Sequence, residues 1–244
     1  MSRFKYCIIG KNWGKKINRI LFLLNKQTYI FSTDKKYLSN EYFEDLKIFI
    51  FKKKINILWI AIPPLQLEKF LLKFFKLKIK IDLILEKPLI FKKNFLDKKK
   101  CINFIKNNFI FVNFEFLFLK KIRKIKKTNI KEIDFNFHTK MKSNYQINPI
   151  FNLGCHLYSI KEFFFSKIKK VNIYVSEGVF DKRNILIKYH NRTKEINFTN
   201  NKELILQKFI KYCENTIKYK SKNLLNFNLG LKITNQLKNI KKIN

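Results

Sequence analysis

The chain has 244 residues, of which 46% are hydrophobic, and it carries a formal net charge of +36. This hydrophobic fraction supports a packed core and excludes a disordered protein. No apolar stretch reaches the roughly 18 residues that a membrane-spanning helix needs, so we expect no membrane span.

The positive charge would suit a nucleic-acid-binding protein, because clustered basic groups neutralise phosphates. Almost all of the charge comes from Lys, however, and the Lys residues are spread along the whole chain. Arg supplies the bidentate contacts that read nucleic acid, and only five residues are Arg. We therefore interpret the charge as a drift in composition and expect no specific nucleic-acid partner. Nucleic-acid binding stays an alternative hypothesis.

The cysteines, at positions 7, 101, 155 and 213, lie far apart and form no C-x-x-C pair. This spacing argues against a zinc site and a disulfide framework, and it indicates a reducing compartment. The N-terminal residues lead directly into an apolar run, without the h-region and cleavage site of a signal peptide. We expect a cytoplasmic protein with no metal site.

The first half of the chain alternates between apolar runs and amphipathic stretches. Strands are predicted over 5–9, 28–31, 55–62, 79–85 and 109–114, and helices over 15–24, 67–75 and 94–107. The run 47–51 fits either a strand or a helix end. The alternation predicts an α/β fold with a Rossmann-type, doubly wound parallel sheet in a first domain over 1–117.

The pattern changes after about residue 118. Helices are predicted over 119–127, 152–165, 204–218 and 225–240, and strands over 130–138, 171–175, 184–189 and 193–198, with Asn191 and Arg192 as a turn. Grouped strands predict an α+β domain over 118–244 with one mostly antiparallel sheet. The last helix is a candidate to pack on the first domain.

Loop residues that can bind a ligand follow several of the predicted strands. Gly10, the run 32–34, Pro63-Pro64 and Glu86-Lys87-Pro88 all stand at carboxyl ends of strands, where parallel sheets bind their ligands. Gly10 and Gly14 partly match the dinucleotide fingerprint G-x-G-x-x-G, in a loop that is one residue shorter. Two glycines also fit an ordinary tight turn.

Asp34 stands twenty residues after Gly14, where an acidic group accepts the ribose hydroxyls of NAD. The alternative is an ordinary loop aspartate. Lys35 and Lys36 beside it would instead neutralise the 2′-phosphate of NADP, so both cofactors stay open.

Three motifs carry a resemblance to a known family. They are Ala61-Ile62-Pro63-Pro64, Glu86-Lys87-Pro88-Leu89 and Gly154-Cys155-His156. In this order and spacing they resemble the Gfo/Idh/MocA family, the relatives of glucose–fructose oxidoreductase and inositol dehydrogenase. The resemblance covers about 5–160 and returns weakly over 225–237.

The resemblance implies an NAD(P)-dependent oxidoreductase acting on a polyol, a sugar or a nucleotide-linked sugar. Lys87 would reach the nicotinamide and the substrate hydroxyl, often from a cis Lys-Pro bond, and Glu86 would hold it. Without the resemblance, Glu86 and Lys87 would be a surface ion pair closing a strand. His156 would take the hydroxyl proton, and Asn152 would orient the His156 ring. A homo-oligomer through the open face of the second sheet is also expected.

The predicted cofactor-binding residues come from the strand ends of the first domain. They are Gly10, Asn12, Trp13 and Gly14 for the pyrophosphate, Ser32, Thr33 and Asp34 for the ribose, and Ile62, Pro63, Pro64, Glu86 and Lys87 along the cleft. The segment 113–115 (NFE) stands at the family's crossover into the second domain, where it would contact substrate or ribose.

The sequence departs from the family pattern at several positions. Asn152 replaces the usual Asp and carries no charge to support an imidazolium. Leu67 and Ser159 stand where the family usually has His and a frequent Asp. Cys155 and His156 would point about 100° apart on a helix, which argues against a nucleophile pair. An inactive relative that binds a nucleotide or sugar phosphate without turnover is the alternative prediction.

Overall fold

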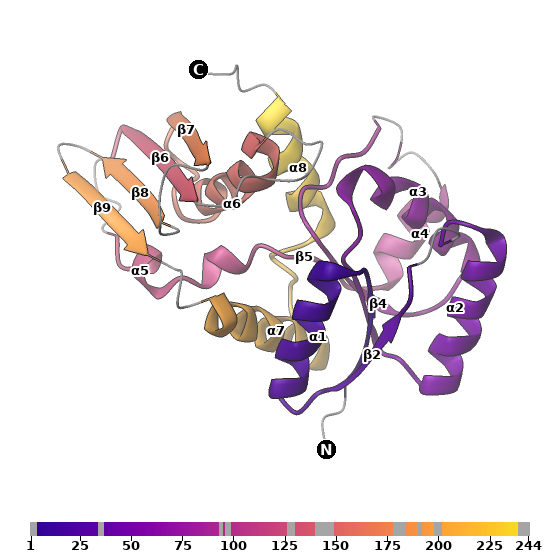
Figure 1. Ribbon diagram of the computed structural model, residues 1–244. Helices are drawn as coiled ribbons and strands as arrows, with labels where there is room; N and C mark the ends of the chain where they lie inside the picture. Colours follow the sequence, from indigo (N-terminus) through magenta and orange to yellow (C-terminus); the bar gives the residue numbers. More distant parts are fainter. Residues whose placement is uncertain are drawn as a thin grey trace. The chain divides into compact units, whose positions relative to one another are not determined.

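The computed structural model describes residues 4–33, 37–92, 95, 99–125, 130–139, 149–177, 184–189, 192–197 and 202–238 (Figure 1). The chain forms two compact units. One comprises Met1–Asn113 and Lys211–Leu231, and the other Phe114–Ile210 and Lys232–Asn244. The division into functional domains after residue 117 stays a prediction.

The first unit is built on a five-stranded parallel sheet. Its strands are β1 (Lys5–Ile9), β2 (Gln27–Phe31), β3 (Ile57–Ile60), β4 (Asp82–Leu85) and β5 (Ile110–Val112), in the order β2-β1-β3-β4-β5. Every residue of β3 is fully buried. Such continuous apolar strands belong to parallel sheets that helices cover on both faces. The predicted Rossmann-type sheet is confirmed.

Four α-helices follow the first four strands of this unit: α1 (Asn12–Leu23), α2 (Asn40–Lys53), α3 (Pro64–Phe74) and α4 (Lys99–Asn107), with the 3-10 helix η1 (Phe75–Leu77) after α3. The ambiguous run 47–51 lies inside α2. This helix begins where the Ser39 side chain accepts a hydrogen bond from the Tyr42 amide at 3.2 Å, and it ends at the left-handed Lys54. The two caps enclose the run 47–51, which is therefore helical.

The first unit also contains the adjoining parts of two C-terminal helices, α7 (Lys202–Lys218) and α8 (Phe227–Lys238). Glu214 of α7 accepts hydrogen bonds from Tyr6 at 2.9 Å and from Lys26 at 2.7 Å. Gly230 of α8 lies so near Leu89 that an added Cβ would be 2.6 Å from the Leu89 Cδ1 atom. A small residue there lets the helix approach closely.

The second unit has a mixed, mostly antiparallel sheet. Its strands are β6 (Glu132–Thr139), β7 (Lys170–Glu177), β8 (Asn184–Tyr189) and β9 (Arg192–Asn197), in the order β7-β6-β8-β9. Only the pair of β6 and β7 is parallel. The predicted α+β arrangement is confirmed. Arg192 begins β9 instead of forming a turn, and Asn191 lies outside the described residues.

One face of this sheet packs on α6 (Pro149–Phe164). Ile133, Phe135 and Phe137 alternate along β6 and are buried, as a sheet with one covered face requires. The opposite face is polar, and there Asn172 donates a 2.7 Å hydrogen bond to Asp134 across the strands. Pairing of this face with a second subunit stays a prediction.

Two short helical segments precede β6. The 3-10 helix η3 (Glu115–Phe118) contacts α6, and α5 (Lys120–Arg123) is shorter than the helix predicted over 119–127. Among the described residues, none of the helices combines the length and hydrophobicity that a membrane span requires.

Candidate active site

The turn after β1 is set by a close approach between two backbone segments. Gly10 has φ +145°, and a Cβ added to it would lie 2.3 Å from the Ala61 carbonyl oxygen. The Ala61 amide in turn donates to the Ile9 carbonyl at 2.7 Å. Only glycine fits this conformation and this space, so Gly10 allows the loops after β1 and β3 to lie in close contact.

Helix α1 begins directly behind this turn. The Lys15 amide donates to the Lys11 carbonyl at 2.9 Å, so the helix starts at Asn12, three residues earlier than predicted. No side chain caps it and its first turn holds no acidic residue. Amides at such a helix start can bind an anion. Asn12 is exposed, Trp13 half-buried and Gly14 buried.

The other predicted cofactor residues stand at the ends of β2 and β3. Ser32 is exposed and Thr33 is buried, whereas Asp34 lies outside the described residues. Ile62 is buried, Pro63 is exposed, and Pro64 is the first residue of α3. Leu67, where the family usually has His, is a core residue of α3 at 1% exposure.

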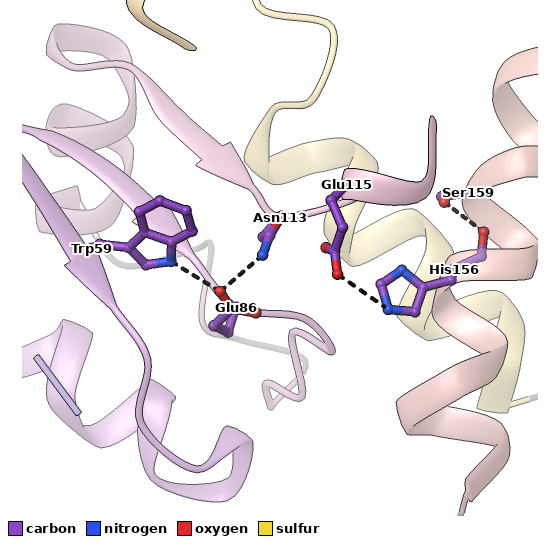
Figure 2. Close-up of polar contacts among 6 residues, drawn as sticks. All are labelled: Trp59, Glu86, Asn113, Glu115, His156 and Ser159. Atoms are coloured by element: carbon purple, nitrogen blue, oxygen red, sulfur yellow. Dashed lines mark hydrogen bonds and ion pairs between the residues drawn. The ribbon is translucent and has the colours of Figure 1, made fainter. Parts of the chain in front are cut away.

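The Glu86 carboxyl group accepts hydrogen bonds from side chains on β3, on α1 and directly after β5. Its Oε1 atom accepts from Trp59 Nε1 at 2.9 Å and from Asn113 Nδ2 at 3.0 Å (Figure 2). The Trp13 side chain also donates to it. Burial raises the pKa of Glu86, while these hydrogen bonds and the Lys87 charge act against that shift. Glu86 thereby fixes the turn that carries Lys87.

Lys87 and Pro88 are joined by a cis peptide bond, as the resemblance implied. Lys87 is half-buried, and Pro88 and Leu89 are buried. The turn is therefore anchored on both sides of Lys87, by Glu86 before it and by the two apolar residues after it.

In the second unit, His156 lies on α6 and is almost completely buried. Its ring stacks on Phe116 with centroids 3.9 Å apart and an interplanar angle of 17°. Its Nε2 atom lies 4.0 Å from Oε1 of Glu115, and the two side chains are 5% and 6% exposed (Figure 2). His156 therefore has an acidic neighbour on η3.

Asn152 and Ser159 flank His156 on the same helix. Asn152 is half-buried one turn before it. The Ser159 hydroxyl donates a 2.7 Å hydrogen bond to the His156 backbone carbonyl and is fully buried. Ser159, which replaces a frequent Asp of the family, is thus bonded to the helix itself.

Trp59 and the positions of Asn113 and Glu115 were not predicted from the sequence. An indole inside an apolar strand was a usable signal, because a buried Trp N–H needs an acceptor. A lone Glu in the apolar run 114–118 (FEFLF) was another, because buried carboxylates need partners. Asn113 contacts Glu86 in the first unit, and Glu115 contacts His156 in the second. Contacts of this segment with substrate stay a prediction.

No protein-family model and no curated protein matches the sequence. Solved structures do match over nearly the full chain. GenD2 from gentamicin A biosynthesis, solved in complex with NAD, is 9% identical with a TM-score of 0.74 and covers 98% of this chain and 93% of its own. UDP-N-acetylglucosamine 3-dehydrogenase GnnA from Acidithiobacillus ferrooxidans is 10% identical with a TM-score of 0.72 and covers 98% and 97%.

The dehydrogenase MviM from Clostridium difficile is 14% identical, with a TM-score of 0.62 and coverage of 97% and 98%. The structural neighbours are dehydrogenases of the Gfo/Idh/MocA type. At this level of identity the likeness concerns the fold, and it agrees with the fold that the sequence motifs implied.

Proposed function

We propose that the protein is an NAD(P)-dependent oxidoreductase. It would transfer a hydride between the nicotinamide and a CH–OH or carbonyl group of a polyol, a sugar or a nucleotide-linked sugar. The observation that carries the proposal is the carboxyl edge of the parallel sheet, where Gly10, Ala61 and Glu86-Lys87 follow adjacent strands. Dinucleotides bind at this edge in such sheets.

The start of α1 supports the cofactor assignment. Amides of residues 12–14 would receive the pyrophosphate, and no acidic residue in the first turn opposes an anion there. Residues 32–34 would bind the adenosine ribose, and Ile62 to Pro64 would line the cleft. The NAD in the GenD2 structure supports this cofactor class, while NADP stays open.

Three side chains would carry the chemistry of the reacting oxygen. A dinucleotide held by residues 12–14, 32–34 and 62–64 would supply the hydride-transfer chemistry at the substrate carbon. The Lys87 ammonium group would stabilise negative charge on the substrate oxygen, His156 would accept its proton, and Asn152 would orient the His156 ring. The sugar-nucleotide named for GnnA and the full-length likeness support a carbohydrate substrate.

A second candidate is a binder of nucleotides or sugar phosphates that catalyses no reaction. Two departures favour it. Asn152 brings no charge to His156, and Leu67 lies in the core instead of presenting an imidazole. The fold would then be kept while turnover is lost.

Titration with NADH and NADPH distinguishes these candidates. Trp13 and Trp59 are the two tryptophans of the chain, and both donate to Glu86. A dinucleotide bound at these strand ends should quench their emission. Turnover is then followed by nicotinamide absorbance with polyols, sugars and nucleotide-linked sugars.

Lys87→Met should lower kcat by about 100-fold or more while dinucleotide binding persists. Lys92→Met, which removes the same charge at an exposed position of the same segment, is the matched control. Binding without turnover of any substrate would favour the second candidate. Absence of dinucleotide binding, together with salt-sensitive binding of DNA or RNA, would overturn both.

A further inference from the structure

The environment of His156 contains a carboxylate that the sequence motif does not supply. Asn152, at the position of the usual Asp, is neutral. Glu115 comes from η3, a different element, and its Oε1 atom is 4.0 Å from the Nε2 atom of His156. The chain thus has a carboxyl group beside the ring, although it lacks one at residue 152.

Both groups are buried, which raises the cost of an unpaired charge and strengthens the attraction between the two groups. A carboxylate that is 6% exposed is costly unless a positive or hydrogen-bonding partner compensates for its lost hydration. The Phe116 ring, stacked on His156, covers one side of the imidazole. Shielding from water strengthens the attraction between a carboxylate and a protonated ring.

Among the described residues, Glu115 is a charged neighbour that faces His156. The buried residues of β6 and β7 on this side of the sheet are apolar, namely Ile133, Phe135, Phe137 and Ile173. On α6 itself, Glu162 is held by Lys161 at 2.8 Å and Lys232 at 2.5 Å. These two lysines satisfy the Glu162 carboxylate.

We propose that Glu115 is the positioning residue of His156 and supplies the negative charge that Asn152 cannot. The Glu115 carboxylate, 4.0 Å from Nε2, attracts the protonated ring and favours this orientation of His156 as the ring exchanges a proton with the substrate oxygen. The inference rests on the proposed function for its role in turnover. The electrostatic pair itself needs no cofactor.

The test is a pH titration of the histidine ring signals by NMR in the full chain. The chain has three histidines, and His156→Gln assigns the signal. In Glu115→Gln the His156 signal should titrate at lower pH than in the wild type, because the ring loses its anionic neighbour. Glu162→Gln is the control, because it removes a carboxylate of the same helix that is paired with Lys161 and Lys232. The pH at which the His156 signal titrates should not change in this variant.

If Glu115→Gln does not fold, the pair can be tested from the other side, in His156→Gln. In His156→Gln, the carboxyl carbon signal of Glu115 should titrate at higher pH than in the wild type. An unchanged partner signal in the folded variant overturns the pair.

Turnover is measured separately on the same proteins. Glu115→Gln should lower kcat/KM by about tenfold or more and shift its pH profile, while NADH affinity persists. Shifted NMR signals in a protein that turns over no substrate would overturn the proposed function and leave the pair intact. Unchanged signals would overturn the pair even in an active enzyme.

Discussion

The two units each hold a shielded carboxyl group at a predicted site, and they hold it differently. Glu86, in the first unit, accepts hydrogen bonds from the neutral groups of Trp59, Asn113 and Trp13. Glu115, in the second, faces the ionisable ring of His156. The Glu86 carboxyl group is therefore a structural anchor among neutral donors. The Glu115 carboxyl group instead lies beside a ring that can gain or lose a proton.

This difference follows the sequence motifs. The Glu86-Lys87-Pro88 motif is complete, and its structure matches what the resemblance implied, including the cis bond. The motif before His156 is altered at Asn152, and there the acidic group comes from η3. In our proposal, Glu115 supplies beside His156 the negative charge that Asn152 lacks.

The largest expected effect concerns Gly10, which allows the loops after β1 and β3 to lie close together. Gly10→Ala should lower the free energy of unfolding by about 3 kcal/mol, because its Cβ would overlap the Ala61 carbonyl and its φ is positive. Gly14→Ala is the control, since its Cβ would meet only the Ile8 side chain at 3.2 Å, within a helix. It should change stability by less than about 1 kcal/mol. Equal effects in urea unfolding would contradict this account.

The next effect tests whether Glu86 depends on its neutral donors. Trp59→Phe removes a donor at 2.9 Å and leaves space in a fully buried position. It should cost about 2 kcal/mol of unfolding free energy. Tyr29→Phe removes an exposed hydrogen bond with Gln27 and should cost less than about 0.5 kcal/mol. If the two variants unfold at the same urea concentration, the Trp59 hydrogen bond does not stabilise the anchor.

The smallest effect is the pH dependence of the Glu86 anchor. Burial raises the pKa of Glu86 in the folded state, so its contribution to stability is present below the unfolded value of about 4.3 and is lost as the pH rises through the folded value. Relative to Glu86→Gln, the wild type should therefore lose unfolding free energy as the pH rises from about 4 towards neutral. A difference between the two proteins that is constant with pH would show that Glu86 titrates as it does in the unfolded chain.

The fold was predictable because its signals are local. Apolar runs gave the strands of both sheets, and Gly10 and Glu86-Lys87-Pro88 marked the strand ends. The start of α1 was placed too late because Asn12, Trp13 and Gly14 resemble a loop, although the Lys15 amide already bonds to Lys11.

The site was less predictable because its contacts join residues that are distant in sequence. Trp59 and Asn113 each lie 27 residues from Glu86, and Glu115 lies 41 residues before His156. No periodicity in the chain links such pairs. The available signals were single residues, the Trp59 indole and the Glu115 carboxylate inside apolar runs. Each indicated that a hydrogen-bonding or charged partner must exist, but not which residue it is.

An experimental structure of the protein with bound NADH tests the central claim most directly. We expect the dinucleotide at the carboxyl edge of β1 to β5, with its pyrophosphate at the start of α1. Lys87 Nζ and the His156 ring should both lie within hydrogen-bonding reach of one reacting oxygen beside the nicotinamide. A structure in which the dinucleotide lies elsewhere, or in which Lys87 and His156 face separate surfaces, would contradict the oxidoreductase assignment.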